Sequence, residues 1–165
     1  MAQKCESGKI IVLPLEIEAR REYDNLILER KKICSKQMKY EYTMNIPGSL
    51  YVKERKLTVR SELTTKENSD FSGKNEVYLD LDKLQQPLIL RNRRDGDWFQ
   101  PLGMQGRQKI KTFFINHKIQ RCERNEIILL VDRLSVIWIE NMHLNDRVKI
   151  TAETKNVLKL DIVES

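Results

Sequence analysis

The chain opens with short apolar stretches that have the period of β-strands. Apolar residues fill positions 10–13 and 26–28, and between them they alternate with polar residues at Leu15, Ile17 and Ala19. Because successive side chains of a strand point to opposite faces, this pattern predicts short paired strands. The basic, polar stretch 30–39 then interrupts the pattern and indicates a connector.

Strand-like alternation resumes in the next segment of the chain. It runs through 40–46 and stops at Pro47-Gly48-Ser49, a sequence typical of turns. Residues 50–52 and 57–63 then complete a unit that resembles a β-hairpin. The polar segment 64–75 contains a glycine and is predicted to be a loop.

The second half of the chain adds strands on either side of one irregular passage. The strand-like segments are 76–81, 87–91, 127–131, 136–139 and 157–163, with a turn at 151–154. Residues 91–106, RNRRDGDWFQPLGMQG, carry three glycines and a proline and are predicted to form an irregular loop.

One segment has a helical period. Ile110, Phe113, Phe114 and His117 fall on one face at i, i+3, i+4 and i+7, which predicts a helix over about 107–118. At about 100° per residue, Arg107, Lys111 and Lys118 project within about 40° of one another beside that face. The predicted fold class is α+β: a strand-rich mixed or antiparallel sheet with one principal helix and short helical turns.

The positive charge is concentrated around this helix. The formal net charge is +6, from 30 Lys and Arg against 24 Asp and Glu. Between Arg91 and Arg124 there are nine basic and three acidic residues, which gives +6 and leaves 21 against 21 elsewhere. A local excess of this kind favours a polyanionic partner.

The residues 88–132, LILRNRRDGDWFQPLGMQGRQKIKTFFINHKIQRCERNEIILLVD, resemble the substrate-binding C-terminal domain of the tRNA isoleucine lysidine synthetase family. The shared elements are paired arginines, Gly-Asp, Pro-x-Gly, a further Gly, spaced lysines on a helix, and an arginine before an apolar strand. The segment GKIIVLPLEIEARREYDNLIL also resembles the strand-rich segment that precedes this domain. We therefore expect 1–36 to be a strand-rich connector and 37–165 to be the C-terminal tRNA-binding domain.

The resemblance implies an enzyme that uses ATP to join lysine to the wobble cytidine of an isoleucine tRNA with a CAU anticodon. Members of the family bind ATP in a PP-loop domain with an SGGxDS-like motif, and this sequence contains no Gly-Gly pair. We therefore expect no catalytic residue and no cofactor in this chain, with ATP and Mg²⁺ bound by a separate catalytic domain. The resemblance further implies that the C-terminal region contacts the acceptor stem and helps to select the tRNA.

The candidate RNA-binding residues are the bases of the central segment, since cationic side chains neutralise phosphates. They are Arg91, Arg93, Arg94, Arg107, Lys109, Lys111, Lys118 and Arg124. The candidate structural loop residues are Gly96, Asp97, Pro101, Gly103 and Gly106. Loop amides and glycines could hold phosphates, whereas a structural alternative has Asp97 pairing with Arg91 or Arg93.

Aromatic residues and possible metal ligands complete the candidate chemistry. Trp98 and Phe99 are adjacent, so one should face the core while the other could stack on a base. Phe113 and Phe114 are expected in the core. The two histidines and three cysteines lack the short paired spacings of zinc ligands, so no metal site is expected.

Two expectations concern location and an alternative function. No apolar run approaches the roughly 20 residues needed to span a bilayer, and the segment MAQKCESGK has no apolar core of a secretory signal. We expect a cytoplasmic protein without a membrane partner. The alternative to RNA binding is a structural role, in which the apolar hairpins dock onto the rest of the enzyme or form a homodimer.

Overall fold

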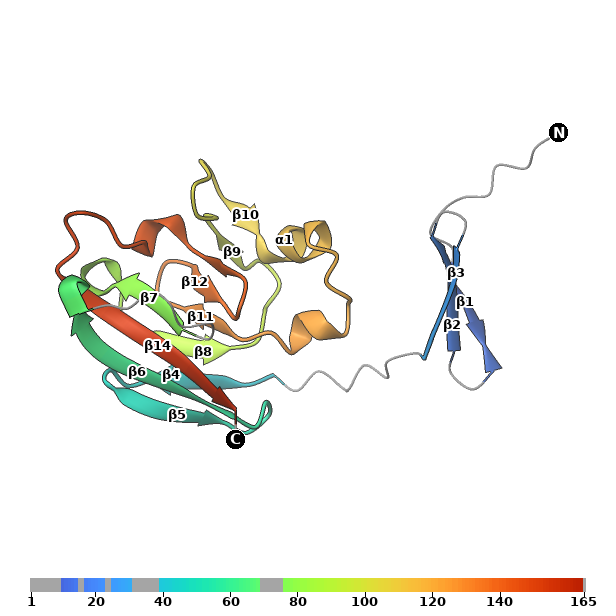
Figure 1. Cartoon of the computed structure of the whole chain (residues 1–165), viewed down its shortest axis with the longest axis horizontal. Coiled ribbons are helices and arrows are strands. Elements are labelled where there is room, and N and C mark those ends of the chain that lie inside the picture. The colour runs from blue at the N-terminus through green and yellow to red at the C-terminus, as the bar shows by residue number, and fades with distance from the viewer. Residues whose placement is uncertain (1–9, 15–16, 23–24, 31–38, 69–75, 165) are drawn as a thin grey trace. The chain divides into compact units, whose positions relative to one another are not determined.

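The computed structural model describes residues 10–14, 17–22, 25–30, 39–68 and 76–164 of the 165-residue chain (Figure 1). The chain divides into two compact units, Met1–Lys36 and Gln37–Ser165. In the first unit, β1 (Ile10–Leu13), β2 (Ile17–Glu22) and β3 (Asn25–Arg30) form an antiparallel sheet in the order β1-β2-β3. The predicted connector residues 31–38 lie outside the described residues.

The second unit is built on two antiparallel sheets. The five-stranded sheet has the order β13 (His143–Leu144), β12 (Val136–Ile139), β11 (Leu129–Val131), β8 (Leu88–Arg91) and β4 (Glu41–Met44). The four-stranded sheet has the order β5 (Gly48–Val52), β6 (Leu57–Thr65), β14 (Asn156–Glu164) and β7 (Glu76–Asp80). The predicted α+β class is confirmed, and every described strand pair in both sheets is antiparallel.

A short hairpin and the helix form a further layer. The hairpin pairs β9 (Trp98–Phe99) with β10 (Gln108–Lys109), and α1 (Ile110–Asn116) follows directly. Short 3-10 turns are η2 (Lys66–Asn68), η3 (Leu81–Lys83), η4 (Glu123–Asn125) and η5 (Asp146–Val148). The described residues contain no helix long and apolar enough to cross a lipid bilayer.

Two hydrophobic clusters lie on opposite faces of the five-stranded sheet. The first fills the space between the two sheets, with Leu90 and Leu130 facing residues such as Val59 and Leu158. The second joins Leu129 and other residues of the sheet to Phe99 and to α1. Neighbours in β11 thus point into different clusters, and every residue of β12 is buried. Figure 1 shows the resulting layers, with α1 and the β9–β10 hairpin on one side of the five-stranded sheet and β5, β6 and β14 on the other.

The helix is shorter than the period predicts. The predicted helix spans about 107–118, whereas α1 spans Ile110–Asn116. It begins later because Gln108 and Lys109 pair with Phe99 and Trp98, which keeps the backbone extended up to Ile110. Ile110, Phe113 and Phe114 are buried as predicted, while His117 is the residue after the last helical one. The expected stripe of Arg107, Lys111 and Lys118 along one helix is therefore wrong, since only Lys111 lies within α1.

Smaller differences concern strand ends and short strands. Gly48 and Ser49 belong to β5 and Thr64 and Thr65 to β6, although the sequence predicts a turn and a loop there. The rest of the predicted loop, 69–75, lies outside the described residues. The strands β9, β10 and β13 are only two residues long and carry too few positions to show a period.

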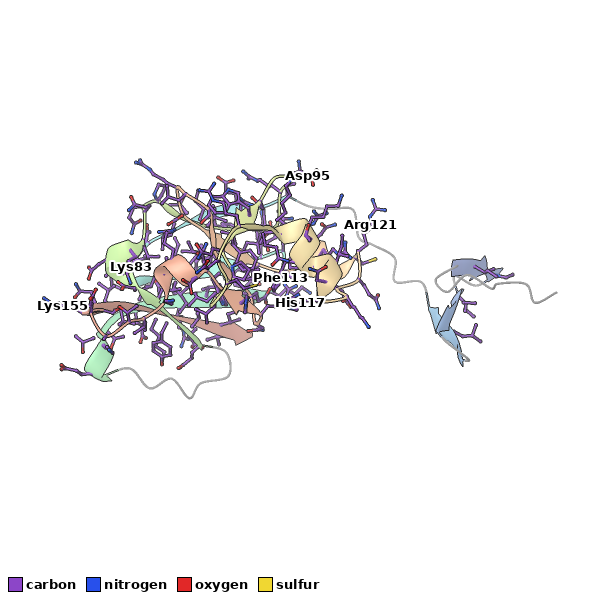
Figure 2. All side chains as sticks on the ribbon, turned by 90° about the horizontal axis from the view of Figure 1, so that it is seen from above. Lys83, Asp95, Phe113, His117, Arg121 and Lys155 are labelled. Carbon is purple, nitrogen blue, oxygen red and sulfur yellow. The ribbon has the colours of Figure 1, made fainter. Side chains whose placement is uncertain are left out.

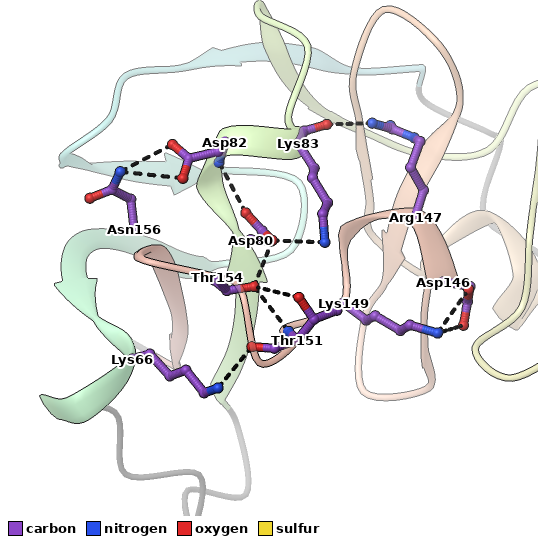
Figure 3. A network of polar contacts seen from close by, with 10 residues as sticks. All are labelled: Lys66, Asp80, Asp82, Lys83, Asp146, Arg147, Lys149, Thr151, Thr154 and Asn156. Carbon is purple, nitrogen blue, oxygen red and sulfur yellow. Dashed lines mark hydrogen bonds and ion pairs between the residues drawn. The ribbon is translucent and has the colours of Figure 1, made fainter.

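A polar network holds the segment after η5 against β7 and η3 (Figure 3). Asp80 is 2% exposed, and its Oδ2 accepts a hydrogen bond from the Thr154 hydroxyl at 2.6 Å. The same oxygen forms an ion pair with Nζ of Lys83 at 2.9 Å. Lys66 donates to the carbonyl of Thr151 at 2.8 Å. Burial alone would raise the pKa of Asp80, but the hydrogen bonds from Thr154 and Lys83 and the charge of Lys83 lower this pKa below its usual value.

Stability is therefore expected to fall in acid through this carboxylate. A folded-state pKa below the unfolded value adds stability at higher pH, and this contribution is lost as pH falls below about 4. Thr154→Val removes a donor, so the variant should be less stable at pH 7 and lose less stability between pH 7 and pH 3. Urea unfolding at both pH values measures the difference. An unchanged pH dependence in the variant would contradict the role of this hydrogen bond.

Candidate nucleic-acid interface

The irregular passage 91–106 is organised by an ion pair between Arg91 and Asp97. Arg91 ends β8 and is 7% exposed. Its Nη1 donates to Oδ2 of Asp97 at 2.8 Å and its Nη2 donates to Oδ1 at 2.7 Å, so the contact is bidentate. The amide of Arg94 donates to the same carboxylate at 2.7 Å. Asp97 therefore closes the loop onto Arg91, as the structural alternative predicts.

The two other arginines of this passage also pair with acids. Arg94 is exposed and its Nη2 pairs with Glu41 of β4. Arg93 is half-buried, with Nη1 3.7 Å from Oδ1 of Asp95 and Nε donating to Oδ1 of Asn125 at 3.1 Å. All three arginines thus help to shape the loop and its surroundings, and their contact with RNA stays a prediction.

The second part of the passage is fixed to η5 and the strand before it. The amide of Asp146 donates to the carbonyl of Gln100 at 2.9 Å, and the amide of Gly103 donates to Oδ1 of Asp146 at 2.9 Å. The Gly103 amide, together with Lys149, holds the pKa of Asp146 below its usual value. Gly103 and Gly106 have φ of 76° and 105°, which explains the need for glycine at these turns.

The hairpin presents one apolar and one basic, aromatic face. Phe99 is fully buried and packs edge-on against Phe113 with ring centroids 5.1 Å apart. Trp98 is half-buried on the opposite face, as the alternation of strand residues requires. Lys109 is its cross-strand partner and is exposed. The guanidinium of Arg107 lies over the Trp98 ring, 4.1 Å from the centroid.

The helix carries Lys111 in its first turn and ends at a lysine in an unusual conformation. The amide of Ile119 donates to the carbonyl of Phe114 and the amide of Lys118 to the carbonyl of Ile115, both at 3.0 Å. This is the Schellman motif, in which glycine usually takes the left-handed position. Lys118 occupies that position with φ of 55°. Lys118 is the residue after the C-cap His117, and its side chain is exposed.

Five exposed cations of this segment have no acidic partner within the part of the chain that the structure describes. Among the described residues, no ion pair involves Arg107, Lys109, Lys111, Lys118 or Arg121. Arg124 is half-buried and its Nε donates to the carbonyl of Ile119 at 2.8 Å. Because a helix of seven residues is only about 10 Å long, the cations around α1 occupy one end of the unit. Figure 2 shows Arg121 and His117 at this end and Lys155 at the opposite one.

The structure divides the candidates into two groups. Arg91, Arg93 and Arg94 pair with acids, whereas no ion pair in the described part of the chain involves Arg107, Lys109, Lys111 or Lys118. Arg124 belongs to neither group, since it donates to a backbone carbonyl. The sequence-based list omits Arg121, although its place in the basic segment is a signal that could have included it. The partner of Arg94 was missed because Glu41 lies 53 residues away in the chain.

The two histidines pack against one aromatic ring. Phe113 has His117 at 3.9 Å and His143 at 5.6 Å between ring centroids. Nδ1 of His117 also lies 2.9 Å from the carbonyl of Phe113. The described part of the chain contains no group of three or more His, Cys, Asp or Glu side chains that could hold a metal ion.

Comparison with known proteins places this segment in a family. The TilS substrate C-terminal domain family matches residues 88–161, which include the hairpin, α1 and the basic segment. Residues 88–161 belong to this family. It is 33% identical to the tRNA(Ile)-lysidine synthase of Caldanaerobacter subterraneus subsp. tengcongensis over 162 residues, which cover 98% of this chain and 34% of the relative. It is 35% identical to that of Clostridium acetobutylicum over 162 residues, covering 97% of this chain and 35% of the relative.

A solved structure supports the fold. The crystal structure of a TilS C-terminal domain matches with a TM-score of 0.65 at 22% identity, and the match covers 77% of this chain and 98% of that one. The chain spans about a third of the length of the curated relatives that it matches. The residues that match the TilS substrate C-terminal domain family include the exposed cations of the segment 107–121.

Proposed function

We propose that this chain binds tRNA through the unpaired cations of the segment 107–121 and contributes substrate selection to a lysidine synthase. The observation that carries the proposal is that Arg107, Lys109, Lys111, Lys118 and Arg121 are exposed and have no acidic partner among the described residues. Most other described cations that contact polar groups of the fold pair with acids, as Lys83 does with Asp80 and Arg147 with Asp132. A face of this kind attracts phosphates, since each phosphate that it neutralises releases counterions.

The loop arginines take a supporting part in this proposal. Arg91 forms a bidentate ion pair with Asp97, and Asp97 directly precedes the hairpin. The ion pair therefore positions the hairpin that carries Arg107 and Lys109. Double-stranded RNA presents a shallow minor groove and regular phosphates, so contact with a stem would depend on shape and charge more than on base edges. We propose the acceptor stem of the tRNA as the region contacted.

The reaction itself is assigned to other parts of the full-length enzyme. The curated relatives are named tRNA(Ile)-lysidine synthase, and this chain matches about a third of their length. We propose that the whole enzyme joins lysine to the wobble cytidine of isoleucine tRNA with a CAU anticodon, with ATP and Mg²⁺ held by a separate catalytic domain. The residues described here would add binding energy and hold the tRNA in place.

A salt titration tests RNA binding. Affinity of the 165-residue chain for an isoleucine tRNA transcript is measured by fluorescence anisotropy between low and moderate salt. The logarithm of the association constant should fall steeply and linearly with the logarithm of salt concentration. Salt-insensitive binding, or none at low salt, would overturn the proposal.

Lys118 allows stability and binding to be separated. Lys118→Gly relieves a left-handed lysine and should raise the free energy of unfolding by roughly 0.5–1 kcal/mol. The same change removes one cation, so the affinity for tRNA should fall a few-fold and the salt slope by about 0.9. Urea unfolding and anisotropy measure the two effects.

Lys56 provides the matched control for this substitution. It has φ of 51° in the turn between β5 and β6, and it is exposed. Lys56→Gly should stabilise the fold by a similar amount and leave tRNA affinity nearly unchanged. Equal losses of affinity in both variants would mean that overall charge, and not the position of Lys118, determines binding.

A docking role is the second candidate function. Three large apolar residues near the basic face are exposed: Leu102 at 44%, Met104 at 55% and Ile115 at 49%. A second copy of the chain or another domain could cover them. Sedimentation that shows concentration-dependent self-association at every salt concentration, without tRNA binding, would favour this function.

A further inference from the structure

The outer face of the β9–β10 hairpin places an aromatic ring next to two cations. Trp98 and Lys109 are paired directly across the two strands, so their side chains leave the hairpin on the same side. Arg107 lies two residues before Lys109, and its guanidinium covers the Trp98 ring at 4.1 Å. All three side chains are at least partly exposed.

This face is held rigidly from behind. Phe99 is fully buried, and the amide of Ile110 donates to the carbonyl of Asp97 at 2.9 Å. The Asp97 side chain is clamped by both terminal nitrogens of Arg91. Contacts on both sides of Trp98 therefore fix its backbone before any ligand arrives, which lowers the entropic cost of binding.

The Trp98 ring beside the exposed cations Arg107 and Lys109 suits the unpaired bases of an RNA. A paired stem offers phosphates to lysine and arginine, but its bases are stacked inside the helix and do not need an aromatic partner. An unpaired base exposes its face and gains from stacking on tryptophan or on a guanidinium plane. Acidic peptides would also suit the two cations, but they would leave the Trp98 ring unused.

We propose that Trp98 and Arg107 form a stacking platform for an unpaired nucleobase next to an RNA stem, with Lys109 on its phosphate. This inference rests on the proposed RNA binding and adds a single-stranded element to the substrate. Lys111 and Lys118 bind the neighbouring stem phosphates. The platform distinguishes a stem with an unpaired extension from a blunt stem.

The test compares two RNA ligands with the same stem. One carries a short single-stranded 3′ extension, and the other is blunt. The intact chain should bind the extended stem about ten-fold more tightly at equal salt. Trp98→Ala and Arg107→Ala should bind both stems with equal affinity, whereas Trp98→Phe, which keeps a ring, should retain most of the preference.

Tryptophan fluorescence gives an independent readout. The chain has two tryptophans, and Trp138 is only 5% exposed in the core. A Trp138→Phe variant leaves Trp98 as the only reporter, and its emission should change with the extended stem alone.

The outcomes separate this inference from the proposed function. Equal affinity of the intact chain for both stems, with unchanged Trp98 emission, overturns the platform and leaves RNA binding intact. Failure to bind either stem at low salt overturns both. A preference that survives in both Trp98→Ala and Arg107→Ala also overturns the platform, because the preference must then come from another surface.

Discussion

Asp97→Ala is expected to lower the free energy of unfolding by about 3–5 kcal/mol, because it leaves Arg91 charged and enclosed without its acidic partner, with only the carbonyl of Asn92 as acceptor among the described residues. The two side chains are 9% and 11% exposed, so little water can replace the lost carboxylate. The amide of Arg94 also loses its acceptor. Urea or thermal unfolding measures the change.

Glu41→Ala is the matched control for this substitution. Glu41 pairs with Arg94, but their side chains are 43% and 47% exposed. Exposed ion pairs contribute up to about 1 kcal/mol, so this variant should remain close to the parent chain. A double variant, Arg91→Met with Asp97→Leu, should recover much of the loss, since it leaves no charge buried. Similar stabilities for Asp97→Ala and Glu41→Ala would contradict the structural role of Asp97.

Replacing Lys109, Lys111 and Lys118 together with alanine should weaken tRNA binding by roughly 100-fold at low salt. Each lysine that neutralises a phosphate contributes about 0.9 to the salt slope, so the slope should decrease by about 2 to 3. The three side chains are exposed and unpaired among the described residues, and the fold should therefore tolerate the change. Anisotropy titrations over a range of salt concentrations measure both quantities.

A second triple variant controls for net charge. Lys53, Lys56 and Lys155 are also exposed, and they lie in the β5–β6 turn and just before β14. Their replacement removes the same charge from other surfaces. If the two triple variants lost affinity to the same extent, the basic segment would have no special role.

The sequence predicts most strands of the two large sheets because they are apolar enough to identify, but it does not predict their division into two sheets. Val136 to Ile139 and the run ending at Val131 are continuous apolar segments, and the structure covers both of their faces. The pair Trp98 and Phe99 is also predicted correctly by alternation alone. Local patterns are sufficient where burial determines the structure.

The basic face is harder to predict because charge balance depends on the tertiary fold. A helical wheel places Arg107 with Lys111, yet a two-residue ladder keeps Gln108 and Lys109 extended and moves Arg107 onto Trp98. The sequence shows nine bases in the segment but not which of them are neutralised, since acids such as Glu41 come from distant strands. Within the segment 91–124, the structure therefore narrows the candidates to the cations that have no acidic partner among the described residues.

The two apolar clusters are separate, so the packing under the hairpin and helix is distinct from the packing between the two sheets. The cluster under Phe99 and α1 has no residue in common with the cluster that contains Leu90 and Leu158, because the five-stranded sheet lies between them. If the hairpin and helix bind RNA as proposed, variation in them can change which RNA is bound while the two sheets keep the domain folded. Substitutions that change binding specificity would then have little effect on the stability of the fold.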